Sequence, residues 1–207
     1  MSAARLESAA VMRRLGHAIV RHDVDDGALR ELTTTVEELL ARVESAPPRS
    51  RPVGNIERDL FLVAPAEGEA RGNRFADCIV TGAANPMGVA AQMRREGDDA
   101  VLHCTLGDAF EGAPGRAHGG MVAALFDETM GFVLSIACTP AFTGRLTVTY
   151  RQPVPLGLPL EFRARLTSRD GRKLLIAGEA HHDGVLLAEA EALFVAVDPD
   201  HFTRGRS

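Results

Sequence analysis

The sequence predicts an α+β fold in which an antiparallel sheet wraps around one long apolar helix. One observation is the apolar stretch over residues 121–138, where the only charges are the adjacent pair Asp127 and Glu128. A segment that is apolar on all sides is typical of a helix inside a core. The other observation is a series of short β-prone segments, bounded by Gly, Pro, Asn and Asp, that starts at Phe75. Strands with a single apolar helix among them favour the α+β class.

Two amphipathic helices are expected ahead of this core. Apolar residues recur at helical spacing on both sides of a polar break at residues 22–27. Pro47 and Pro48 end the second helix, because proline lacks the amide hydrogen that a helix interior needs. We therefore expect an N-terminal helical extension with its linker over residues 1–60 and the main domain over residues 61–207. The extension is expected to cover part of the sheet or to enlarge an oligomer contact.

Seven strands and one helix are expected in the main domain. The segment Leu146–Tyr150 alternates apolar and polar residues, as a strand with one buried face does. Asp170-Gly171 and Asp183-Gly184 are typical of tight hairpin turns. The expected strands are 75–81, 88–95, 100–106, 146–151, 160–168, 173–182 and 185–197, with the helix at 118–138 between the third and the fourth.

The composition, and the motifs that the sequence lacks, exclude several classes of function. The 207 residues carry a net charge of −5 at pH 7, which argues against nucleic acid as the main partner. The three cysteines form no Cys-x-x-Cys pair and no His-Glu-x-x-His occurs, so neither a disulfide framework nor a metal site is expected. A serine hydrolase would need a Gly-x-Ser-x-Gly turn, which the sequence lacks. The widely separated cysteines favour a reduced, cytoplasmic setting, and the acidic pair would be costly in lipid, so no membrane span is expected.

The start and the middle of the apolar helix carry the residues that suggest chemistry. Gly119 and Gly120 fall at the helix N-terminus, where free backbone amides bind anions and carbonyl oxygens. Asp127 falls in the middle, where a charged carboxylate needs a partner or a function. Amide donors and a carboxylate are the groups that attack on a carbonyl requires. On spacing alone, a buried helix whose acid pairs with a neighbouring strand or an arginine is equally consistent.

The spacing between these groups bears on the oligomeric state. Gly119 and Asp127 are eight residues apart, so along a helix they stand roughly 12 Å from one another. Both cannot touch one carbonyl group, because catalytic contacts need atoms within about 3 Å. If both act in one reaction, they come from two copies of the helix that lie antiparallel across a two-fold axis. The catalytic interpretation therefore predicts a homodimer, or a dimer of dimers, with shared sites.

The run from Gly115 to Gly131 resembles the hotdog-fold thioesterases, in the branch of the phenylacetyl-CoA thioesterases and the mammalian acyl-CoA thioesterase superfamily members. It contains His118-Gly-Gly, with Asp127 nine residues after the histidine. Asn85-Pro-Met-Gly before it, the strand that ends in Tyr-Arg-Gln-Pro, and a Gly-Arg-Lys hairpin extend the resemblance to about residues 75–200. The resemblance implies a hotdog fold and hydrolysis of acyl-CoA to free acid and CoA, as in lipid metabolism, with no cofactor and no metal.

The resemblance also implies roles for individual residues. Asp127 corresponds to the family's general base or nucleophile, and the amide of Gly119, with Gly120 as a second candidate, polarises the thioester oxygen. Thr143, sixteen residues after the acid, corresponds to a hydroxyl that holds the attacking water. A threonine that caps a turn at the start of a strand is an equally good interpretation. His118 is expected to orient the motif or to cap the helix.

Two further expectations concern the substrate. The phosphates of CoA require basic groups, and the candidates are Arg145, Arg169, Arg172 and Lys173. Each of these alone is more often a solvated surface charge. Chain-length preference is expected to depend on residues such as Phe126, Met130, Phe132 and Met87. The alternative function is a non-catalytic module that binds acyl-CoA or fatty acid and acts in regulation.

Overall fold

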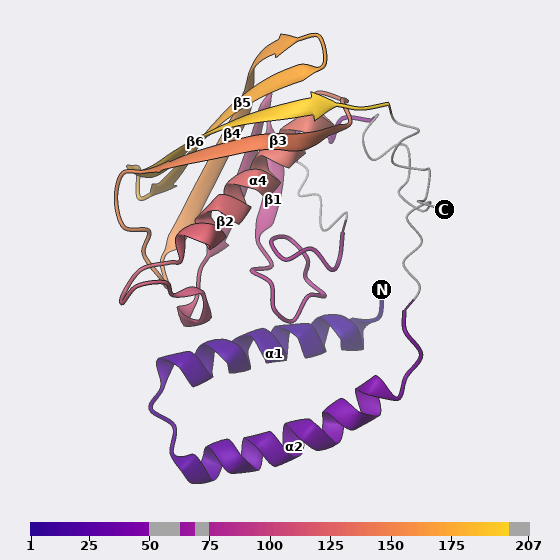
Figure 1. The fold of residues 1–207 in the computed structure, drawn as a ribbon, viewed down its shortest axis with the longest axis vertical. Helices are drawn as coiled ribbons and strands as arrows, with labels where there is room; N and C mark the ends of the chain where they lie inside the picture. The colour runs from indigo at the N-terminus through magenta and orange to yellow at the C-terminus, as the bar shows by residue number, and fades with distance from the viewer. Residues whose placement is uncertain (50–62, 69–74, 199–207) are drawn as a thin grey trace.

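The apolar stretch forms α4, Gly119–Ile136, and this helix lies along one face of a six-stranded antiparallel sheet (Figure 1). The computed structural model describes residues 1–49, 63–68 and 75–198. The strand order is β1-β2-β4-β5-β6-β3, and the predicted α+β class with a sheet around one helix is confirmed. The strands are β1 Gln92–Glu96, β2 Asp99–Thr105, β3 Ala141–Tyr150, β4 Pro159–Asp170, β5 Lys173–His182 and β6 Val185–Ala196.

The core lies between α4 and the inner face of the sheet. Phe126 on α4 packs edge-to-face against Phe162 on β4, with 5.0 Å between the ring centroids. Burying a side chain of this size stabilises the fold by about 1.5–3 kcal/mol. Gly178 on β5 lets the helix approach closely, because a Cβ there would lie 3.1 Å from Met130 Cε and 3.1 Å from the carbonyl oxygen of Arg163. The helix and the sheet are therefore held in one fixed relative position.

The outer face of the sheet, turned away from α4, is mostly polar. Arg163 on β4 binds Glu96 at 2.6 Å and Asp99 at 3.3 Å, which ties the β1–β2 hairpin to the centre of the sheet. The hydrogen bond from Arg163, together with one from Arg94, lowers the pKa of the Glu96 carboxyl. One apolar and one polar face are typical of antiparallel sheets that cover a core on one side.

The first two expected strands are largely wrong. Residues 75–91 form consecutive turns, and β1 begins only at Gln92. The backbone groups here bond locally, since the Gly82 amide donates to the Cys78 carbonyl oxygen at 3.0 Å. Gly82 is required for this turn, because a Cβ would lie 2.2 Å from that same oxygen. The remaining five strands are confirmed, although β3 begins at Ala141 rather than at 146.

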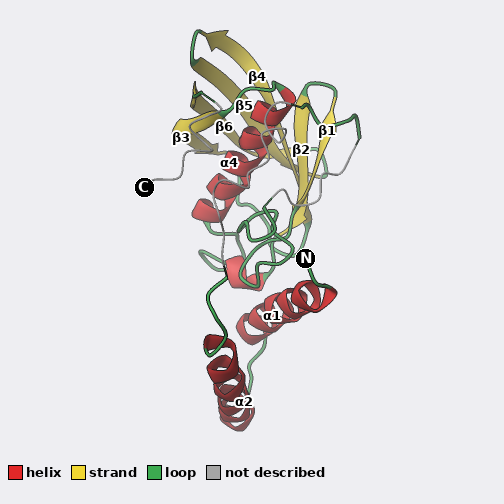
Figure 2. Ribbon diagram, turned by 90° about the vertical axis from the view of Figure 1, so that its right-hand side faces the viewer, coloured by secondary structure: helices red, strands yellow, loops and turns green. Residues whose placement is uncertain are grey.

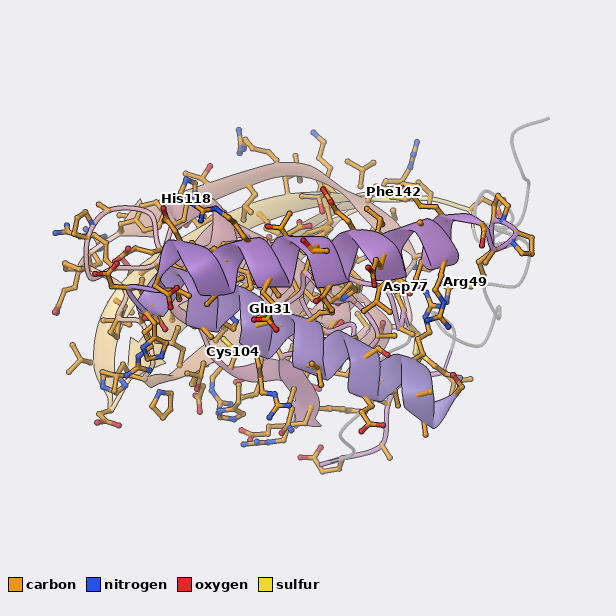
Figure 3. All side chains as sticks on the ribbon, turned by 90° about the horizontal axis from the view of Figure 1, so that it is seen from below. Glu31, Arg49, Asp77, Cys104, His118 and Phe142 are labelled. Carbon is orange, nitrogen blue, oxygen red and sulfur yellow. The ribbon has the colours of Figure 1, made fainter. Side chains whose placement is uncertain are left out.

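The two N-terminal helices are α1, Ala3–Arg21, and α2, Asp26–Glu44, and both lie below the end of the sheet (Figure 2). Seen from below, they run across the underside of the sheet domain (Figure 3). α1 packs against η2, a short 3₁₀ helix over Asp108–Phe110, rather than along a face of the sheet. The extension therefore does not cover a face of the sheet, and the alternative, that it enlarges an oligomer contact, stays a prediction. The expected domain boundary at residue 60 lies outside the described residues.

α4 is the one helix in the described ranges whose length and apolarity would also suit a membrane span. Core helices of globular proteins share both features. Half of this helix is buried inside the fold against the sheet. Its composition is thus accounted for by its place in the core.

Candidate active site

Asp127 lies on the open side of α4, the side that the sheet does not cover. Its carboxylate is exposed, as are Gly120 and, on the neighbouring β3, Thr143. Thr143 Oγ1 donates a hydrogen bond of 2.8 Å to Asp127 Oδ1. The expectation of a buried carboxylate is wrong for the single chain, because α4 packs on the sheet along one side only. The acid and the threonine that the sequence singled out do lie together.

The second acid of the pair faces elsewhere. Glu128 Oε1 accepts a hydrogen bond of 2.8 Å from Thr81 Oγ1, in the loop before β1. Adjacent helix residues differ in direction by about 100°, so Asp127 and Glu128 cannot share one pocket. Glu128 therefore anchors the 75–91 loop, and Asp127 alone is available on the open side.

The N-terminus of α4 offers one free amide. His118 is the N-cap residue, and its Nδ1 accepts from the Gly120 amide at 2.9 Å. The His118 carbonyl accepts from the amides of Met121 and Val122. Within the part of the chain that the structure describes, the Gly119 amide has no hydrogen-bond partner. Gly119 is thus the available donor, Gly120 is occupied, and His118 caps the helix.

Tyr150 is a site residue that the sequence reasoning missed. Its hydroxyl donates a hydrogen bond of 2.7 Å to the carbonyl oxygen of Gly119. The contact is close, because a Cβ on Gly119 would lie 3.1 Å from that hydroxyl oxygen. Burial raises the pKa of Tyr150, so the phenol remains a donor at neutral pH. Two features of the sequence could have indicated Tyr150. It is the chain's only tyrosine, and in the alternating strand it falls on the face that is turned towards α4.

The predicted CoA-binding arginines do not form one group. A β-bulge between Thr143 and Arg145 reverses the alternation of β3, so Arg145 pairs with Leu193 on the outer face. There it lines a groove of about 270 Å³, on the opposite side of the sheet from Asp127. Arg145 is therefore separated from the acid by the sheet itself.

The other three basic candidates lie together at the β4–β5 hairpin. Arg169 Nη1 donates to Thr139 Oγ1 at 3.3 Å, just beyond the C-terminal end of α4. Arg172 Nε donates to the Ala196 carbonyl oxygen at 2.9 Å, and Lys173 is exposed. This cluster lies near the C-terminal end of α4, whereas Gly119 begins that helix.

The expected acyl-tunnel residues are mostly sealed. Phe126 and Met130 are fully buried and Phe132 is 8% exposed, all within the core. They face the core because α4 turns its large side chains inward and its small ones outward. Only Met87, which is 74% exposed, is open to a ligand in the single chain. That these four residues set the acyl preference stays a prediction.

The described residues give little support for a cysteine nucleophile or a metal site. Burial raises the pKa of Cys104 to about 12, so its thiol is not a nucleophile at neutral pH. In the ranges 1–49, 63–68 and 75–198, no three His, Cys, Asp or Glu side chains are arranged to hold a metal ion. The carboxylate of Asp127, the hydroxyl of Thr143 and the amide of Gly119 remain the best candidates for catalysis.

Part of this sequence is similar to known proteins. Residues 114–189 match the Thioesterase superfamily. The chain is 36% identical over 95 residues to acyl-coenzyme A thioesterase THEM4 of Xenopus laevis, and this alignment covers 45% of this chain and 43% of that protein. THEM4 of Mus musculus is 35% identical over 92 residues, covering 44% and 40%. The chain thus matches less than half the length of these relatives.

A solved structure extends the similarity to the N-terminal helices. The crystal structure of RHA08564, a thioesterase superfamily protein, matches with a TM-score of 0.79 over 94% of this chain and 92% of that one. Its sequence identity of 24% makes this a likeness of fold. The predicted family resemblance is confirmed: residues 114–189 match the thioesterase superfamily, and the chain has the hotdog fold.

Proposed function

We propose that this protein hydrolyses acyl-CoA thioesters to free acid and CoA, at a site shared between two copies of the chain. The observation that carries the proposal is the 2.8 Å hydrogen bond from Thr143 to Asp127 on the open side of α4. The unpartnered Gly119 amide at the start of the same helix supplies the complementary donor. The acyl-CoA substrate class is inferred from the names of the THEM4 relatives.

Asp127 supplies the base in this proposal. The hydroxyl of Thr143 occupies Oδ1 and leaves Oδ2 to receive a proton from water. As the water oxygen bonds to the thioester carbon, its proton passes to Asp127. The C–S bond then breaks, and the proton passes to the departing CoA thiolate. A carboxylate that attacks the carbon directly would use the same residue, forming a mixed anhydride as the CoA thiolate leaves. If water then opens the anhydride at the Asp127 carbon, oxygen-18 from labelled water would enter the protein before it enters the product.

The Gly119 amide stabilises the charge that forms on the thioester oxygen. It lies at the positive end of an 18-residue helix, so the helix dipole adds to its effect. Removing one donor of this kind lowers kcat by about 10²–10³-fold in enzymes that attack acyl groups. This contribution requires that the amide be free of other partners, as it is among residues 1–49, 63–68 and 75–198.

A second copy of the chain is needed to bring the two groups together. In one chain Asp127 and Gly119 are roughly 12 Å apart along the helix axis. Among the described residues β3 is an edge strand that pairs on one side, with β6, and it borders the open side of α4. Long edge strands invite pairing with another chain. An antiparallel mate on this edge would place its Gly119 beside Asp127, and would bring the Arg169–Lys173 cluster towards the mate's helix N-terminus.

The test is turnover of a panel of acyl-CoAs, followed by loss of the thioester absorbance. Asp127→Ala is expected to lower kcat by more than 100-fold while acyl-CoA binding, measured by calorimetry, changes little. Glu128→Gln is the matched control on the same helix and is expected to keep kcat. If the wild type binds acyl-CoA but hydrolyses none of the panel, the non-catalytic binding function replaces this one.

A further inference from the structure

α1 contacts the main domain next to the residues that lead into the Gly119 amide. His17 Nδ1 accepts a hydrogen bond of 3.1 Å from the Ala109 amide in η2. The same ring packs edge-to-face on Phe110, with 5.3 Å between centroids. Gly107 approaches the ring so closely that a Cβ there would lie 2.6 Å from Nδ1. Figure 1 shows α1 below η2, at the end of the sheet where α4 begins.

The chain of contacts continues from η2 to the start of α4. The Phe110 carbonyl oxygen accepts from the His118 amide at 2.8 Å. Gly112 packs on the same residue, since a Cβ there would lie 2.7 Å from His118 Cα. The peptide unit that carries the Gly119 amide begins at the His118 carbonyl carbon. The orientation of His118 therefore sets the direction in which that amide points.

α1 also holds the loop on the other flank of α4. Arg13 Nη1 donates to the carbonyl oxygens of Ala83 at 3.0 Å and of Asn85 at 2.7 Å. Thr81 in the same loop binds Glu128 of α4. Arg13 and His17 are four residues apart, so they project from one face of α1. This face thus joins two loops that each contact α4.

We propose that α1 is a positioning element of the thioester-oxygen site, and that His17, through η2 and His118, fixes the direction of the Gly119 amide. The inference rests on the proposed thioesterase function. Without the Nδ1 acceptor, the Ala109 amide loses its partner and η2 is free to shift. A displacement of about 1 Å in a catalytic group costs on the order of 10²-fold in rate.

Two substitutions of His17 test its hydrogen-bond acceptor and its ring packing separately. His17→Asn keeps an acceptor near the position of Nδ1, whereas His17→Phe keeps the ring packing and removes the acceptor. We expect His17→Phe to lower kcat by about 10–100-fold with KM changed less than about threefold, and His17→Asn to stay within about threefold of the wild type. His22→Phe, at the exposed end of the same helix, is the control and is expected to keep kcat.

A spectroscopic readout distinguishes positioning from general stability. The amide ¹H–¹⁵N signal of Gly119 is expected to move in His17→Phe and to stay in place in His22→Phe. A role in stability alone would lower the Tm of His17→Asn and His17→Phe alike and leave this signal and kcat unchanged, which would overturn the inference. If His17→Phe does not fold, His17→Gln takes its place. The side-chain oxygen of glutamine falls near the position of Nε2 rather than Nδ1, so we expect the same fall in kcat relative to His17→Asn.

Asp127→Asn in the same assay separates the two hypotheses. If Asp127→Asn loses activity and His17→Phe does not, the positioning role is wrong and the thioesterase proposal stands. If Asp127→Asn keeps full activity, the thioesterase mechanism itself is wrong, and the Gly119 signal alone decides whether His17 orients the amide.

Discussion

The hydroxyl of Tyr150 donates a 2.7 Å hydrogen bond to the carbonyl oxygen of Gly119, so the end of β3 is joined to the start of α4. Thr143, near the other end of the same strand, binds Asp127 in the middle of the helix. One edge strand therefore holds both the donor end and the acid of α4. Because β3 is also the strand open to a second chain, catalysis and dimer formation are expected to depend on the same element.

Tyr150→Phe removes the hydroxyl and keeps the ring. A neutral hydrogen bond contributes about 0.5–1.5 kcal/mol, so we expect the free energy of unfolding to fall by about 1 kcal/mol. We also expect kcat to fall by a few-fold to about tenfold, because the peptide unit after the Gly119 amide loses its anchor. Denaturant titration and steady-state kinetics measure both effects. Unchanged kcat in a folded Tyr150→Phe dimer would remove Tyr150 from the site.

Thr143→Val and Thr143→Ser test separately what the hydroxyl and the branched shape of the side chain contribute to activity. Valine keeps the β-branch and removes the hydrogen bond to Asp127, so we expect kcat to fall on the order of tenfold, about 1.4 kcal/mol. Serine keeps the bond and is expected to stay within about threefold of the wild type. Equal kinetics for valine and serine would show that Thr143 only caps the strand.

Gly131→Arg tests whether the open side of α4 is an interface. A Cβ at Gly131 meets nothing within 4 Å in the single chain, so the substitution is expected to leave the fold intact. In a dimer that face is covered, and a bulky charge there is expected to yield monomers in sedimentation velocity with little turnover. Thr35→Arg on the exposed side of α2 adds the same charge as a control. A fully active Gly131→Arg dimer would place the interface elsewhere.

Cysteine labelling tests the environment of the thiols. The raised pKa of Cys104, about 12, keeps this residue as a protonated thiol throughout the pH range in which the protein is handled. Cys138 is exposed. At pH 8 we expect Cys138 to react with iodoacetamide and Cys104 to react only after denaturation, as read by mass spectrometry. Labelling of native Cys104 at the rate of Cys138 would contradict its burial.

Local sequence patterns were sufficient to predict the elements whose sequence pattern is uniform along their length. α4 is continuous and apolar, and the two Asp-Gly turns define the hairpins that connect β4, β5 and β6. Segments 75–81 and 88–95 have the composition of strands, but the backbone groups of residues 75–91 bond within turns, and these turns need glycine at positions 82 and 88. Nothing in a period-2 pattern distinguishes such a segment from a strand.

The candidate site could be predicted only in part, because several of its contacts are long-range. The spacing of sixteen residues placed Thr143 beside Asp127 through the resemblance, and the structure has the two in contact. The bulge that turns Arg145 to the outer face inverts a strand pattern that looked regular. The contacts of Tyr150 with Gly119 and of His17 with Ala109 join segments 31 and 92 residues apart, which no local pattern reports.

Gly119→Pro isolates the amide donor. Proline lacks the N–H and suits the first position of a helix, and His118 already has the extended backbone, with φ −65° and ψ 131°, that precedes proline. We expect kcat to fall by about 10²–10³-fold. Gly119→Ala adds the same Cβ and keeps the amide, so it controls for the tight contact with Tyr150.

The shared site is tested most directly by mixing two inactive variants, Asp127→Asn and Gly119→Pro, under conditions where subunits exchange. Each mixed dimer would hold one site with both defects and one intact site, so activity is expected to recover to about a quarter of the wild type. Native mass spectrometry verifies that mixed dimers form. If they form and the activity stays at the level of the separate variants, the two groups do not act across the dimer, and the account is wrong.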